Sequence, residues 1–214
     1  MGAKQETQKS NRSKKIIFNI IVVGSNMAGK TGLLQSYEYM VTNNIEYDEK
    51  NNQPLNTNIQ HLIINIGCEY RALSITIKNE KNEDINCLVK VWDSTGGERF
   101  RSIVLSSVKN KQGLLLAYDI TMRSTFEDLN QWIRQINDYQ DISEFPIIIV
   151  GCKLDLEDKR EVSTEEGHTF AAKYKCPFFE TSARTGKGVK ESFSALIQKV
   201  YEKNKNKNNL FGLY

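Results

Sequence analysis

Residues 24–31 read Gly-Ser-Asn-Met-Ala-Gly-Lys-Thr and fit the pattern G-x-x-x-x-G-K-[ST] of a phosphate-binding loop, or P-loop. The glycines of such a loop let backbone N–H groups turn toward the phosphates of a nucleotide. Lys30 can reach the β- and γ-phosphates, and the hydroxyl of Thr31 can ligate Mg²⁺. An apolar run at 15–23 precedes the loop and a helix-compatible segment at 32–40 follows it. This strand–loop–helix context is the one that the motif requires, so the sequence predicts a site for nucleotide phosphates.

An Asp-x-x-Gly motif follows a second apolar run. Asp93 comes just after the alternating run at 85–91, and Gly96 lies three residues further on. A carboxylate at the end of a strand can support the Mg²⁺ shell, and a glycine there lets a backbone N–H approach a γ-phosphate. The motif is weak by itself, but behind a P-loop and a strand it favours a nucleoside triphosphate site.

Two further motifs suit the recognition of a base. Lys153 and Asp155 form a Lys-x-Asp motif after the apolar run at 145–150. The carboxylate of Asp155 could accept hydrogen bonds from the ring N–H and the exocyclic amine of guanine, although a surface turn has the same pattern. Ser182 and Ala183 follow the next strand-like run, where small residues allow the backbone to approach a base.

The elements around these motifs alternate between strands and helices. Strands are predicted at 69–78 and 85–91, joined as a hairpin by a polar turn, and at 113–118, 145–150 and 176–180. Capping boxes at 124–127 and 163–166 predict the starts of two helices, and a last helix is expected at 187–201. Apolar strands that alternate with helices form parallel sheets covered on both faces. The predicted fold class is α/β, with a six-stranded, mostly parallel sheet, one antiparallel edge strand and helices on both faces.

Bulk composition limits the function further. A chain of 214 residues with a net charge of only +3 predicts one domain and gives no support for a nucleic-acid partner. The four cysteines form no C-x-x-C pair, which favours a reduced, cytoplasmic setting, and the longest apolar run is too short to span a bilayer. Disordered tails are expected at 1–14, which is basic, and at 203–214, and an Asn-rich loop at 43–61.

The order of P-loop, W-D-x-x-G, K-x-D and E-T-S-A resembles that of Ras-like small GTPases, and the Rab branch fits best. Residues 92–102 resemble Rab's WDTAGQERFRS, and residues 118–121 and 178–183 also look like Rab. The resemblance covers residues 15–202 in order. It implies a divergent Rab-like GTPase domain with the P-loop small GTPase fold, which binds GTP or GDP with Mg²⁺ and hydrolyses GTP to GDP and phosphate. As a molecular switch in vesicle or membrane trafficking, it would work in the cytoplasm and peripherally on endomembranes.

The resemblance also implies roles for single residues. Mg²⁺ would be held by Thr31, Asp93 and Asn65, and Lys30 would act in catalysis beside the position of Gly97. Effector and exchange proteins would bind through two switch regions, at 43–66, which carries the Asn-rich insert at 43–61, and at 96–108. The nucleotide would contact Gly24, Asn26, Ala28, Gly29, Lys30, Thr31, Gly32, Gly96, Lys153, Asp155, Ser182, Ala183 and Arg184.

Three departures from the family pattern concern hydrolysis. The family's water-orienting Gln after D-x-x-G is Gly97 here, which has no side chain to position the attacking water, so we expect slow hydrolysis. The Thr of the first switch is Asn65, whose carbonyl could still ligate Mg²⁺. Asn26 stands where Gly or Ser is common in the P-loop and could crowd a γ-phosphate or an incoming Arg finger.

Other departures concern the base, the partners and the membrane. The Asn of N-K-x-D is Cys152, and the loss of an amide that pairs with the base edge would cost about 1–3 kcal/mol. Rab's aromatic pair in the second switch is Ser107-Val108, which argues against ordinary Rab effector binding. The chain ends at 210–214 without Rab's prenylated cysteines, so we expect membrane contact to be weak or indirect.

Two alternatives remain open from the sequence. A pseudo-GTPase scaffold that binds partners with little or no turnover would also explain Gly97. A P-loop kinase or ATPase is disfavoured by Asp155 and by Ser182-Ala183, and equal affinity for ATP and GTP would revive it.

Overall fold

The structure is a computed structural model that describes residues 16–48, 69–94, 97 and 100–206. The predicted tail at 1–14, most of the Asn-rich insert at 43–61 and the chain beyond 206 lie outside these residues. Asn65 and Gly96, two of the predicted site residues, also lie outside them.

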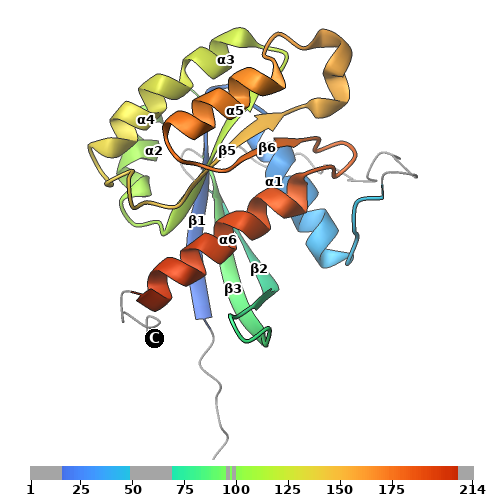
Figure 1. Ribbon diagram of the computed structural model, residues 1–214, viewed down its shortest axis with the longest axis vertical. Helices are drawn as coiled ribbons and strands as arrows, with labels where there is room; N and C mark the ends of the chain where they lie inside the picture. The colour runs from blue at the N-terminus through green and yellow to red at the C-terminus, as the bar shows by residue number, and fades with distance from the viewer. Residues whose placement is uncertain (1–15, 49–68, 95–96, 98–99, 207–214) are drawn as a thin grey trace, which may run out of the picture.

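The core of the fold is a six-stranded sheet in the order β2-β3-β1-β4-β5-β6 (Figure 1). Only the edge strand β2 is antiparallel, paired with β3, and all other neighbours are parallel. This confirms the predicted α/β sheet with one antiparallel edge strand. The strands are β1 (Ile16–Val23), β2 (Glu69–Lys78), β3 (Asp84–Asp93), β4 (Gly113–Asp119), β5 (Ile147–Cys152) and β6 (Phe178–Thr181).

Helices cover both faces of the sheet because alternate side chains of the strands point to opposite faces. Ile20 and Val22 of β1 pack in the apolar cluster under α1 and α6, while Ile21 and Val23 pack in the cluster under α2, α4 and α5. The helical segments are α1 (Lys30–Thr42), α2 (Arg101–Val108), α3 (Arg123–Glu127), α4 (Leu129–Asn137), the 3₁₀ segment η2 (Leu154–Lys159), α5 (Thr164–Lys173) and α6 (Val189–Asn206).

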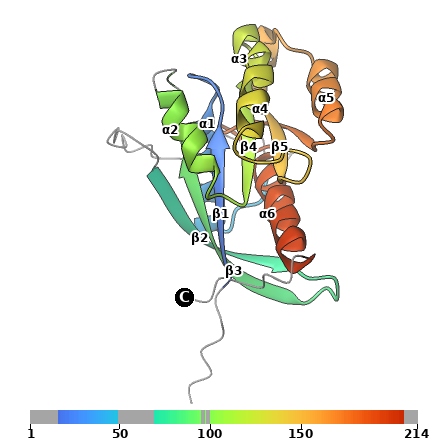
Figure 2. The same cartoon turned by 90° about the vertical axis from the view of Figure 1, so that its left-hand side faces the viewer.

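The two helices of the first face are joined by an aromatic stack. The rings of Tyr37 in α1 and Phe193 in α6 lie parallel, with centroids 3.8 Å apart. At the far end of α6, Figure 2 shows the turn of the β2–β3 hairpin, where Lys205 pairs with Glu80 at 2.5 Å. The helix continues to Asn206, so the first residues of the predicted tail at 203–214 are helical.

One predicted capping box is confirmed and the other is wrong. The hydroxyl of Ser163 accepts from the N–H of Glu166 at 3.2 Å, and the Glu166 carboxylate accepts from the Ser163 N–H at 2.9 Å. In the box at 124–127, α3 instead begins at Arg123, so its N-cap is Met122, two residues before Ser124, with no side-chain cap. A residue distant in sequence fixes this start, because the carboxylate of Glu161 accepts a hydrogen bond from the N–H of Arg123 at 2.7 Å.

No helix among the described residues is both long and apolar enough to cross a membrane.

Candidate functional site

The P-loop joins β1 to α1 and depends on two glycines. Gly24 has φ +147°, and a Cβ there would lie 2.2 Å from the carbonyl oxygen of Ala117 in β4. Gly29 has φ +92° and precedes α1 with no side-chain cap, so the first N–H groups of the helix have no local side-chain acceptor. A helix start of this kind attracts phosphate, since its N–H groups and its dipole both favour an anion. The glycines therefore let the loop pack against β4 and β5 in a conformation that residues with side chains would strain.

Lys30, the first residue of α1, is folded back over the loop. Its ammonium donates to the carbonyl oxygen of Ser25 at 2.7 Å, and the residue is only 6% exposed. Burial lowers the pKa of Lys30 to about 8, and the charge of Asp93 counteracts part of this effect. A buried ammonium at the base of an anion-binding loop is poised to gain from an incoming phosphate.

Thr31 and Asp93 bring two hard oxygen ligands together. The Thr31 hydroxyl donates to a carboxylate oxygen of Asp93 at 2.7 Å, and β1–β3 pairing places Asp93 opposite Val22. The buried Ser94 hydroxyl donates to the carbonyl oxygen of Val22 at 2.7 Å, which fixes the chain just beyond β3. Within the described residues no group of three or more His, Cys, Asp or Glu side chains could hold a metal. One hydroxyl and one carboxylate nevertheless fit Mg²⁺, which keeps waters and takes phosphate oxygens as its other ligands.

The predicted base-binding residues meet beyond β5 and β6. The Ser182 hydroxyl donates to the carboxylate of Asp155 at 2.7 Å, and the Ser182 carbonyl accepts from the Gly186 N–H at 2.8 Å. Lys153 has φ +68°, and its ammonium pairs with Asp119 at 2.5 Å. Asp155 and Ser182 line a cavity of about 700 Å³ together with Arg184.

The phosphate loop and the base loops are in contact. A Cβ at Gly29 would lie 3.0 Å from the Cβ of Cys152, the last residue of β5. A Cβ at Gly32 would lie 3.5 Å from the Cβ of Ala183. The predicted residues of both loops therefore belong to one continuous site at the carboxyl ends of the strands, where ligands of α/β sheets bind. Ala28 is buried beneath the loop, and Asn26 is exposed at its rim.

Sequence reasoning missed several residues of this site. Tyr47, from the described start of the Asn-rich segment, lines the cavity beside Asp155, and so does Lys187. Asp119 is buried at the end of β4 and holds Lys153 in place, while it also accepts from the N–H and hydroxyl of Thr121 at 2.8 Å. A charged residue at the end of a fully buried strand was the available signal for Asp119, because a buried carboxylate needs partners.

A polar cluster that the motifs did not indicate connects the P-loop to two helices. The Ser25 hydroxyl donates to the carboxylate of Asp128 and accepts from the indole N–H of Trp132 at 3.3 Å. Asp128 also pairs with Arg101, the first residue of α2, at 3.2 Å, and the Arg101 guanidinium lies 4.1 Å from the centroid of the Trp132 ring. The start of α2 is thus tied to the P-loop through side chains.

Gly97 lies just before α2. Its carbonyl oxygen accepts from the N–H of Phe100 at 2.9 Å. A Cβ at Gly97 would make an ordinary contact with the Phe100 ring at 3.5 Å, so the backbone leaves space for a side chain at this position.

Comparison with known protein families gives a match that covers most of the chain. The model of the Ras family matches residues 19–202. The matched residues include every described strand except the first three residues of β1, and they contain the P-loop and the base-binding loops. The chain therefore belongs to the Ras family of small GTPases, which are nucleotide-binding switches.

Proposed function

We propose that this protein is a Rab-like guanine-nucleotide switch in vesicle or membrane trafficking, and that it holds GTP with Mg²⁺ but hydrolyses it slowly. The observation that carries the proposal is the contrast at one site. Gly29 and Gly32 approach Cys152 and Ala183, which lie next to the loops that carry Asp155 and Ser182, yet Gly97 offers no side chain. The chain thus has the groups that would bind a nucleotide, but it lacks the glutamine that orients the attacking water in the family.

The phosphates would lie on the backbone of the P-loop and the start of α1. The Lys30 ammonium would leave the carbonyl of Ser25 for the β- and γ-phosphates and compensate their charge. Thr31 and Asp93 would hold Mg²⁺, which would supply positive charge next to the phosphates.

The base would lie in the cavity beside Asp155. Its carboxylate, already oriented by the Ser182 hydroxyl, would accept the two N–H groups on the Watson–Crick edge of guanine. Adenine presents no such donor pair, which supports a preference for guanine. Cys152 is buried behind the P-loop and brings no amide to the base, so this preference rests mainly on Asp155.

Effector and exchange proteins would dock near the second switch on an aromatic surface of β2 and β3. Tyr70 is 47% exposed and its ring centroid lies 4.8 Å from that of Trp92. The ammonium of Lys111 lies 3.9 Å from the Trp92 centroid. Val108, at one position of Rab's aromatic pair, is buried in the core and contributes nothing to this surface. Aromatic side chains flanked by cations are typical anchors of protein interfaces, so we expect partners unlike those of ordinary Rab proteins.

The first test is the nucleotide content of the purified full chain, measured by chromatography over hours with Mg²⁺ present. Bound GTP that persists for hours supports a slow switch. Conversion of GTP to GDP at an ordinary Rab rate would contradict the interpretation of Gly97. Equal retention of ATP and GTP would contradict the role of Asp155.

A pseudo-GTPase scaffold is the second candidate, favoured by one observation. Lys30 is satisfied by the carbonyl of its own loop, so the P-loop is compatible with a state without nucleotide. Finding no nucleotide and no uptake of added GTP would favour this candidate over the switch.

A further inference from the structure

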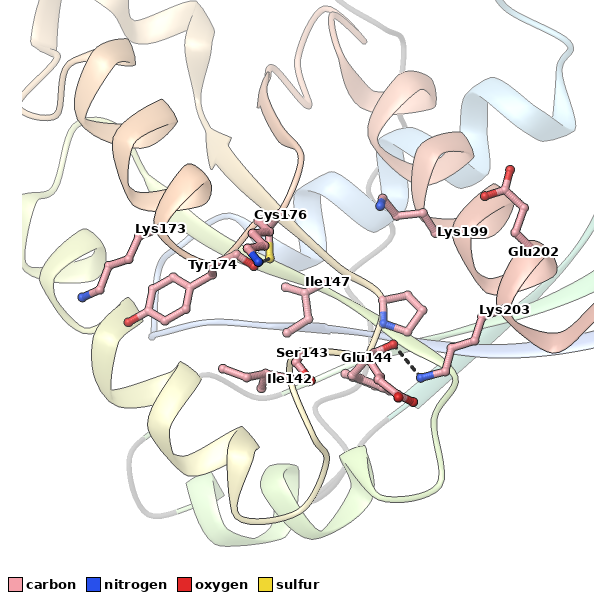
Figure 3. Close-up of a pocket in the computed structure, with 13 residues that line it drawn as sticks. Ile142, Ser143, Glu144, Ile147, Lys173, Tyr174, Cys176, Lys199, Glu202 and Lys203 are labelled. Atoms are coloured by element: carbon pink, nitrogen blue, oxygen red, sulfur yellow. Dashed lines mark hydrogen bonds between the residues drawn. The ribbon is translucent and has the colours of Figure 1, made fainter. Parts of the chain in front are cut away.

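A second cavity lies at the end of the sheet away from the P-loop (Figure 3). It has a volume of about 680 Å³ and is bounded by the α4–β5 connection, the α5–β6 connection and the last part of α6. Ile147 at its floor begins β5, and Cys152 at the other end of the same strand lies behind the P-loop. The cavity is therefore separate from the nucleotide site, with the length of a strand between them.

The floor and walls of this cavity are apolar. Phe145 and Ile147 are buried beneath it, and Ile142, Tyr174 and Cys176 are half-buried at its sides. Burial raises the pKa of the Cys176 thiol to about 11, so the thiol is neutral at physiological pH and acts as an apolar wall. These side chains leave apolar surface that an aliphatic chain could cover.

The rim of the cavity is basic. Lys173, Lys175 and Lys199 are exposed, and none of them takes part in an ion pair within the described part of the chain. On one side of the rim, the ammonium of Lys203 donates to the carbonyl oxygen of Glu144 at 2.5 Å (Figure 3). Four lysines and two glutamates line the cavity, so the rim has an excess of positive charge and attracts an anion.

We propose that this cavity binds a single-chain amphiphile with an anionic head, such as a fatty-acid carboxylate, as a monomer from solution. The aliphatic chain would lie on Ile142, Ile147 and Tyr174, and the head would lie between Lys175 and Lys199. The volume is within the range of about 300–1,000 Å³ that is typical of small-molecule pockets. An alkyl chain suits this floor better than a peptide, whose amide groups would lose water over an apolar surface without hydrogen-bond partners.

The test is calorimetric titration of the full chain with octanoate, decanoate and dodecanoate, each below its critical micelle concentration. Each methylene buried in the cavity should tighten binding about fourfold, because burying one is worth about 0.8 kcal/mol. Decanoate should therefore bind on the order of tenfold more tightly than octanoate. Decanol, which has the same chain and no charge, should bind up to about fivefold more weakly than decanoate.

Variants separate the head site from general charge effects. Lys199→Glu should weaken decanoate binding about tenfold or more, because it reverses the charge nearest the proposed head. Lys159→Glu makes the same change in charge at an exposed position at the end of η2, beyond the other end of β5, and should leave binding unchanged. Cys176→Trp should fill the cavity and abolish binding, and circular dichroism would verify that this variant folds.

Several results would overturn the proposal. Absence of saturable decanoate binding to the wild-type chain would do so, as would affinities that do not depend on chain length. Equal effects of Lys199→Glu and Lys159→Glu would show that the head does not bind at Lys199. Binding to anionic phospholipid vesicles without binding to monomeric decanoate would show that the basic rim attracts a membrane surface and that the cavity does not bind the amphiphile.

Discussion

The phosphate-binding end of the site and the position that would orient water for hydrolysis are built in opposite ways. Gly24, Lys30 and Asp93 stand at the ends of strands or at the start of a helix, and each contacts a neighbouring strand, loop or helix. Gly97 stands on the connection before α2, where its carbonyl oxygen accepts from the N–H of Phe100. We therefore expect nucleotide binding and nucleotide turnover to depend on separate parts of this chain, so that binding persists where turnover is weakened.

Lys30→Ala should have the largest effect on the binding side of this comparison. Removing a buried ammonium that pairs with phosphates should weaken GDP and GTP binding on the order of 10²-fold. The melting temperature of the nucleotide-free protein should stay the same or rise, because the variant no longer buries a charge. Fluorescent-nucleotide titration and thermal melts would measure both, with Lys81→Ala as the control. Unchanged GDP affinity would show that the P-loop is not the phosphate site.

Cys152→Asn should restore binding at the base. An amide at this position should improve GDP affinity about tenfold. This gain lies in the lower to middle part of the about 1–3 kcal/mol expected for the added hydrogen bond. The preference for GTP over ATP should rise with it. Competition titrations with both nucleotides would test this expectation, and Cys176→Asn serves as a matched control at a thiol outside the nucleotide site. Lower affinity in Cys152→Asn would mean that the space behind Gly29 is too small for the amide.

The pH dependence of binding should report on Lys30. Its pKa is lowered to about 8 by burial in the nucleotide-free protein, and a bound polyphosphate would raise it again. Below pH 8 the ammonium is already charged, so it contributes no slope. Above pH 8 binding must take up a proton, and the GDP dissociation constant should rise by up to about tenfold per pH unit. A slope that persists in Lys30→Ala would assign the effect to another group.

Asp128→Asn should have the smallest effect and would test how the P-loop is coupled to the second switch. The change keeps the shape of the side chain but removes the charge that pairs with Arg101. Water still reaches this pair, whose side chains are 12% and 25% exposed, so we expect GDP to dissociate about fivefold faster at most, corresponding to about 1 kcal/mol. Asp138→Asn changes an exposed carboxylate at the opposite end of α4 and should leave the rate unchanged. Equal rates in both variants would show that the Ser25 cluster does not influence nucleotide release.

Local patterns predicted the fold and the phosphate loop well. The apolar run at 15–23 and the glycine spacing indicated β1 and its loop, and the face of Leu33, Leu34, Tyr37 and Met40 is buried as a helical period requires. The box at 163–166 was also read correctly, because both of its partners lie within one turn.

Contacts between distant segments could not be predicted from local patterns. The helix start at Arg123 is fixed by Glu161, and Lys153 is held by Asp119, each pair separated by more than thirty residues. Tyr47 reached the base cavity from a segment with no clear period, so no pattern could place it. The roles of Asn65 and Gly96 stay predictions, since both lie outside the described residues.

The most direct test of the central claim is single-turnover hydrolysis of preloaded GTP by the wild-type chain and by Gly97→Gln, with Mg²⁺ present. The backbone leaves space for a side chain at 97, so the glutamine can be introduced without a clash at its Cβ. We predict very slow hydrolysis in the wild-type chain and an increase on the order of tenfold or more in Gly97→Gln, with GTP affinity unchanged. Fast hydrolysis by the wild-type chain, with no gain from the glutamine, would contradict the account and show that another group orients the water.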